Sequence, residues 1–112
     1  MIDLIEKASS VGGVYISPIS IWEIAMLEAQ NRIHLGKDIH QWVEDAITVS
    51  GVKQTELTPQ VLIDSTKLPG NFHKDPADRM IIATSRANGL LLLTQDERIL
   101  AYSQEGYVNT VR

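Results

Sequence analysis

The stretch that decides the fold is residues 75–96, DPADRMIIATSRANGLLLLTQD. Asp75 followed by Pro76 is typical of the start of a helix, and Gly89 is typical of its end. The four leucines at 90–93 follow at once, and a run this short is typical of a strand buried on both faces of a parallel sheet. A helix that leads directly into such a strand indicates an α/β fold.

The rest of the chain alternates in the same way between helical stretches and short apolar runs. Further strands are predicted at 14–17, 52–57 and 107–111, and further helices at 19–30, 38–49, 58–67 and 95–103. Residues 1–9 are predicted to be the tail of a helix that ends at Gly12-Gly13. The pattern predicts an α/β protein with one domain over residues 1–112, containing about four strands and about six helices.

Length and composition exclude several classes of protein. The chain has 112 residues, of which 44% are hydrophobic and 21% are charged, as expected for one globular domain. The absence of cysteine excludes disulfide frameworks and zinc-thiolate sites. Short apolar runs predict neither a membrane span nor a secretion signal, so the expected location is the cytoplasm. A net charge of −4 argues against RNA binding through a basic coat, but it suits a site built from carboxylates.

Three acidic residues are predicted to meet at one edge of the sheet. Glu23 follows the 14–17 strand, and Asp96 follows the 90–93 strand. Asp78 lies in the first turn of the helix that leads into the 90–93 strand. Helix starts and strand ends share one edge in right-handed βαβ winding, and ligands bind outside that edge. Three acids without matching bases would repel one another unless cations neutralise them. The pattern therefore predicts a Mg²⁺ or Mn²⁺ site for phosphoryl transfer.

Each of the three acids also has a purely structural interpretation. Glu23 fits a capping box with Ser20, in which its carboxylate returns to a backbone N–H group. Asp78 fits the third helical position after an N-cap at Asp75, and Asp96 fits the first turn of the following helix. Capping is the commoner role for any one such residue. The gathering of all three at one edge favours the metal site.

Three segments of the chain resemble the PIN-domain ribonucleases, and most closely the VapC-like toxins of bacterial toxin–antitoxin pairs. These segments are ISPISIWEIA at 16–25, DPADRMIIAT at 75–84 and LTQD at 93–96. Residues 38–42 and 68–73 resemble the same subgroup, so the resemblance covers essentially the whole chain with its motifs in the expected order. It implies a three-layer α/β/α fold around a short, mainly parallel sheet.

The resemblance also implies a Mg²⁺- or Mn²⁺-dependent endoribonuclease that hydrolyses RNA phosphodiester bonds with metal-activated water. Glu23, Asp78 and Asp96 are then both the catalytic and the metal-binding residues. Thr94 is expected to assist at the substrate, and Arg79 is predicted either to contact an RNA phosphate or to balance local charge. The implied partners are an RNA substrate and a cognate antitoxin protein, and the implied assembly is a homodimer.

The chain departs from the family pattern at its start. Members of the family begin with a central strand that ends in an aspartate, whereas Met1-Ile2-Asp3 is predicted to lie at the end of a helix. The 14–17 and 90–93 strands would then lack their common neighbour, and one acidic ligand would be absent. Three outcomes are open: the two strands pair directly with each other, a partner chain fills the gap between them, or the natural protein is longer. The alternative function is therefore a catalytically impaired PIN-like domain that acts by homo-oligomerisation or by binding an antitoxin or RNA.

The remaining polar and aromatic residues carry weaker predictions. His73 is expected to be a loop residue that at most touches substrate. Lys74, Arg86 and Arg98 are the other bases expected near the acidic edge, and they are few for a protein that grips RNA. Trp22 is predicted to lie in the core, with a subunit interface as the second choice.

Overall fold

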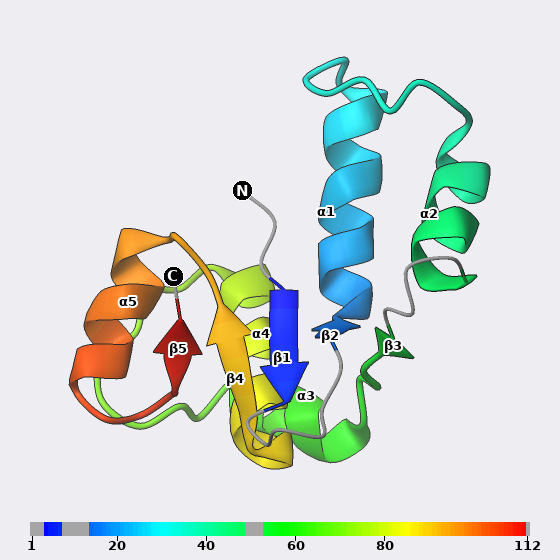
Figure 1. The fold of residues 1–112 in the computed structure, drawn as a ribbon. Coiled ribbons are helices and arrows are strands. Elements are labelled where there is room, and N and C mark those ends of the chain that lie inside the picture. Colours follow the sequence, from blue (N-terminus) through cyan, green and yellow to red (C-terminus); the bar gives the residue numbers. More distant parts are fainter. Residues whose placement is uncertain (1–3, 8–13, 49–52, 112) are drawn as a thin grey trace.

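The computed structural model describes residues 4–7, 14–48 and 53–111, which form a sheet flanked by helices (Figure 1). The elements follow in the order β1 Leu4–Lys7, β2 Val14–Ile16, α1 Pro18–Ala29, α2 Ile39–Thr48, β3 Lys53–Gln54, α3 Pro59–Ser65, α4 Pro76–Asn88, β4 Leu90–Leu93, α5 Glu97–Gln104 and β5 Thr110–Val111. None of the helices in these ranges combines the length and the apolar character of a membrane span.

The five strands form one sheet in the order β3-β2-β1-β4-β5. Strand β2 pairs with β3 in parallel, β4 pairs with β5 in parallel, and β1 runs antiparallel to both β2 and β4. All strands except β1 therefore run in one direction. This arrangement confirms the expected α/β fold with a short, mainly parallel sheet.

Strand β1 occupies the centre of the sheet, where the sequence predicts a missing neighbour. Ile5 is opposite Tyr15 of β2 on one side and Leu92 of β4 on the other. The helical prediction for this segment is wrong, because a run of a few apolar residues fits a strand as well as a helix. Pairing on both sides satisfies backbone groups that β2 and β4 would otherwise leave unpaired in the middle of the sheet.

The helices begin and end where the sequence predicts. Pro18 opens α1 behind the N-cap Ser17, and the N-cap Thr58 precedes α3 in the same way. Asp75 is the N-cap of α4, and Gly89 ends that helix in the left-handed conformation with φ of 61°. These side chains satisfy N–H groups that the first helical turn leaves without partners.

The core lies between α3, α4, β4 and α5. Ile81 and Ile82 of α4, Leu92 of β4, and Ile99 and Tyr102 of α5 are each at most 1% exposed. Helices α1 and α2 stand side by side next to β2 and β3, at one edge of the sheet (Figure 1). Trp22 on α1 is 55% exposed. The prediction that Trp22 is a core residue is therefore wrong.

The loop between α3 and α4 is held tightly against the start of α4. The Arg79 guanidinium donates to the carbonyl of Ser65 at 2.8 Å and to the carbonyls of Phe72 and His73 at 3.2 Å each. Gly70 has φ of 70°, and a Cβ atom there would lie 2.5 Å from Cε2 of Tyr107. Only glycine fits this position without displacing the Tyr107 ring. These contacts fix where the loop places its side chains.

Candidate functional site

Asp78 lies at the start of α4, the helix before β4 in the chain, and Asp96 lies at the start of α5, the helix after β4. Asp78 lies in the first turn of α4, where Asp75 Oδ1 accepts hydrogen bonds from the N–H groups of Ala77 and Asp78. Asp96 is the N-cap of α5, and its Oδ1 accepts from the backbone N–H of Arg98 at 2.8 Å. The cap occupies Oδ1 of Asp96 and leaves Oδ2 directed toward the Arg98 side chain.

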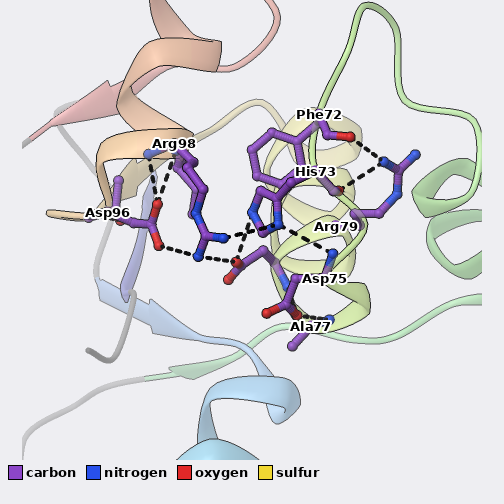
Figure 2. A network of polar contacts seen from close by, with 10 residues as sticks. Phe72, His73, Asp75, Ala77, Arg79, Asp96 and Arg98 are labelled. Atoms are coloured by element: carbon purple, nitrogen blue, oxygen red, sulfur yellow. Dashed lines mark hydrogen bonds and ion pairs between the residues drawn. The ribbon is translucent and has the colours of Figure 1, made fainter.

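The Arg98 guanidinium faces both carboxylates. Figure 2 shows Arg98 beside Asp96 and His73. Arg98 places its Nη2 3.6 Å from Oδ2 of Asp96 and 3.9 Å from Oδ2 of Asp78. Its Nη1 is 3.5 Å from Nδ1 of His73. The Arg98 side chain is 61% exposed, so only part of its surface is covered by these contacts. Two acids that are distant in the sequence thus share one positive group.

The electrostatics of Asp96 favour its ionised form. Partial burial alone would raise the pKa of Asp96, but the N–H groups of Arg98 and Ile99 and the Arg98 guanidinium together hold that pKa below its usual value. Hydrogen bonds from donors stabilise the charged carboxylate and not the neutral acid. Asp96 is therefore a carboxylate at neutral pH and can face a cation.

Asp78 is the more deeply buried acid of the pair. It is 8% exposed, and its Oδ2 lies 3.1 Å from Nε2 of His73. The other ring nitrogen of His73, Nδ1, accepts from the backbone N–H of Asp75 at 3.3 Å. A buried carboxylate needs polar partners because losing its hydration is costly. His73 and Arg98 supply two of those partners for Asp78.

Glu23 lies on the neighbouring helix α1, beside the pair and not within it. Because α1 begins at Pro18, Glu23 lies beyond the first turn, and the capping box with Ser20 is wrong. Glu23 lines a hollow of about 450 Å³ between α1 and α4, together with Ile19, Trp22, Met26, Asp75, Pro76, Ala77 and Met80. Within residues 4–7, 14–48 and 53–111, no three acidic, histidine or cysteine side chains are close enough to hold one metal ion.

Thr94 and Arg79 both have bonding partners within the protein. Thr94 is buried, its Oγ1 accepts from the N–H of Asp96 at 3.1 Å, and its own N–H donates to the carbonyl of Val111 at 3.0 Å. Arg79 donates to three carbonyls of the loop that precedes α4. Thr94 therefore helps to place Asp96, and Arg79 helps to place His73. The contacts of Thr94 and Arg79 with substrate stay predictions.

His73 and Arg98 make more contacts with the acids than the sequence predicts. Arg98 follows the capping acid Asp96 by two residues, and His73 precedes the capping residue Asp75 by two residues, so each is close to a helix start. That spacing is the signal that could have placed both near the acids. Arg86 is the opposite case: it lies in the last turn of α4 and donates to the carbonyl of Tyr107, so its expected place at the acidic edge is wrong.

Two carboxylates that share one cation fit the requirements of Mg²⁺ or Mn²⁺. Mg²⁺ is usually held by one or two carboxylates, with water and phosphate oxygens completing its coordination. Asp78 and Asp96 supply such oxygens, and the exposed Arg98 side chain has room to move into solvent. A larger hollow of about 580 Å³ lies near Asn88 and Leu90, at the other end of α4, and is therefore separate from these acids.

Comparisons with known proteins identify relatives of the chain. The family model described as PIN domain matches residues 2–104. The chain is also 34% identical over 87 residues to Ribonuclease VapC22 of Mycobacterium tuberculosis (strain ATCC 25618 / H37Rv). The matched region covers 78% of this chain and 65% of VapC22, so the chain spans less than two thirds of that relative. No solved structure matches the chain significantly.

Proposed function

The chain belongs to the PIN-domain family and is VapC-like, and on that premise we propose that it is a metal-dependent endoribonuclease of a toxin–antitoxin system. The observation that carries the proposal is the pair Asp78 and Asp96, whose Oδ2 atoms face the same nitrogen of Arg98. The similarity to a protein named as a ribonuclease supports RNA as the substrate.

The cofactor we assign is Mg²⁺ or Mn²⁺, held by Asp78 and Asp96 with Glu23 as a third ligand from α1. When bound, such an ion activates water and stabilises charge on the phosphodiester. The low pKa of Asp96 keeps that carboxylate charged, and Thr94 orients it through the Asp96 N–H group. Arg98, once it no longer bridges the acids, can donate to phosphate oxygens of the RNA.

The partners we assign are a cognate antitoxin protein and a second copy of the chain, in the cytoplasm. The hollow beside Glu23 supports a protein partner, because the exposed Trp22 and the side chains of Met26 and Met80 line it. Exposed apolar surface of this kind is typical of protein interfaces.

RNA cleavage by the purified chain tests the proposal. We expect cleavage of RNA in Mn²⁺ or Mg²⁺, none in excess chelator, and a loss of about 100-fold or more in Asp78→Asn and in Asp96→Asn. Asp45→Asn is the matched control, since Asp45 lies on α2 and pairs with Lys37. Cleavage that persists in chelator, or that is unchanged in Asp78→Asn, would contradict the metal-dependent mechanism.

A second candidate is a catalytically impaired PIN-like domain that acts by binding RNA, an antitoxin or itself. The observation that favours it is that only two of the three predicted acids lie together in the described part of the chain. Retention of RNA without cleavage in Mn²⁺, or dimer formation that rises with concentration in an inactive chain, would favour this second candidate.

A further inference from the structure

The two ring nitrogens of His73 have different roles. The backbone N–H of Asp75 points to Nδ1 at 3.3 Å, and the guanidinium of Arg98 lies 3.5 Å from the same atom. Both groups are hydrogen-bond donors, so Nδ1 must be the acceptor of the ring. A neutral imidazole with an acceptor at Nδ1 carries its proton on Nε2.

The Nε2 atom of His73 is buried next to the Asp78 carboxylate. It lies 3.1 Å from Oδ2 of Asp78, but the angle of the contact departs from that of a full hydrogen bond. The side chains of His73 and Asp78 are only 22% and 11% exposed, so water has little access to the contact. A buried N–H group without an aligned acceptor is costly, and Oδ2 of Asp78 lies within reach to supply one.

The loop around His73 keeps the imidazole in this place. The Phe72 ring packs against the His73 ring with a centroid distance of 4.2 Å. Arg79, one residue after Asp78, donates to the carbonyls of both Phe72 and His73 (Figure 2). The imidazole and the Asp78 carboxylate are therefore held relative to each other through the first turn of α4.

We propose that His73 is a positioning residue, which orients the Asp78 carboxylate for the divalent ion through its Nε2–H group. The inference rests on the proposed function, because it assumes that Asp78 is a metal ligand. It goes further by assigning a role to a loop histidine that lies outside the set of acids. Groups that hydrogen-bond to metal-binding carboxylates typically change metal affinity or activity by about 10–100-fold when removed.

Two substitutions separate the two nitrogens of His73. Asn places a side-chain oxygen about where Nδ1 lies, so His73→Asn keeps an acceptor for the Asp75 N–H and loses the contact with Asp78. Gln places its amide nitrogen about where Nε2 lies, so His73→Gln keeps a donor for Asp78. His40→Asn is the control, because His40 lies exposed on α2. Each variant is compared with the wild-type chain by Mn²⁺ titration and by RNA cleavage.

We expect His73→Asn to bind Mn²⁺ about 10–100-fold more weakly and to lose kcat with little change in KM. His73→Gln should stay close to wild type, as should His40→Asn. Equal losses in the Asn and Gln variants, or an Asn variant that matches wild type, would overturn the positioning role alone. A wild-type chain that binds no Mn²⁺ would overturn the proposed function and this inference with it.

The tautomer of His73 gives a readout that needs neither metal nor RNA. Nitrogen NMR of the wild-type chain should show the neutral His73 ring with its proton on Nε2. A ring protonated on Nδ1 would overturn the inference even if the chain cleaves RNA.

Discussion

Helices α1 and α4 start alike and have different surroundings. Both open with proline behind a capping side chain, and they have 12 and 13 residues. Helix α4 buries six residues, Asp78 among them, whereas α1 buries only Ser20 and Ile24. The acid of α4 therefore belongs to a packed and hydrogen-bonded frame, and Glu23 of α1 borders an open hollow.

The contrast indicates that the α4 side and the α1 side of the candidate site have different roles. Asp78, Asp96, His73 and Arg98 form one network of contacts. The α1 side contributes a carboxylate and apolar surface around Trp22, which a ligand or partner would complete. Substitutions of the buried apolar residues of α4 should therefore act mainly on stability, and substitutions of exposed residues on α1 should act mainly on binding.

The largest effect that sharpens this contrast is expected from Ile82→Ala. Ile82 has no exposed surface in the core beneath Asp78, and truncation of such a residue leaves a cavity. We expect the free energy of unfolding to fall by about 4 kcal/mol, measured by urea denaturation. Trp22→Ala should lower it less, by about 1–2 kcal/mol, because about half of the Trp22 side chain is exposed. Similar losses in both variants would show that α1 and α4 are equally well packed.

A smaller loss is expected from Gly70→Ala, with Gly36→Ala as its control. Both glycines have a positive φ, of 70° and 77°, but only a Cβ on Gly70 would meet another residue, namely Tyr107. The positive φ costs about 1–2 kcal/mol at either position, and the overlap with Tyr107 adds about 1–2 kcal/mol at Gly70. Thermal unfolding of both variants measures the difference. Equal melting temperatures would mean that the ring of Tyr107 moves aside without cost.

The smallest effect on stability is expected at Asp96, where two substitutions separate capping from charge. Asp96→Ala removes the N-cap of α5 and should cost about 1 kcal/mol. Asp96→Asn keeps a good N-cap and should leave stability almost unchanged. Both variants should lose Mn²⁺ affinity, because neither keeps the carboxylate. Urea denaturation measures the stability of both variants, and calorimetric titration measures their affinity for Mn²⁺. Undiminished Mn²⁺ binding in Asp96→Asn would remove Asp96 from the metal site.

The parts of the fold that follow local rules could be predicted from the sequence. Caps, prolines and Gly89 mark the bounds of α1, α3 and α4, and the leucine run marks β4. Strand β1 could not be predicted in this way, because its four residues fit a helix equally well. β1 is a strand because it pairs with β2 and β4. The pattern of apolar residues within these four positions does not reveal that pairing, and β4 is distant in the sequence.

The candidate site shows the same division. The proximity of Asp78 and Asp96 follows from the general rule that helix starts and strand ends share an edge. The contacts of His73 depend on a loop whose shape is set by Arg79 and by the packing of Gly70 against Tyr107. Such contacts join distant parts of the chain, so no short sequence pattern predicts them.

The hydrogen bond from the Thr94 N–H to the Val111 carbonyl has a consequence for the order of assembly during synthesis. Thr94 also accepts from the N–H of Asp96, so β5 supports the backbone next to that acid. The ribosome makes residues 78 and 96 before it makes residue 111. A nascent chain that already contains both acids therefore still lacks the strand that supports the backbone beside Asp96, and the candidate site is complete only after β5 has been made.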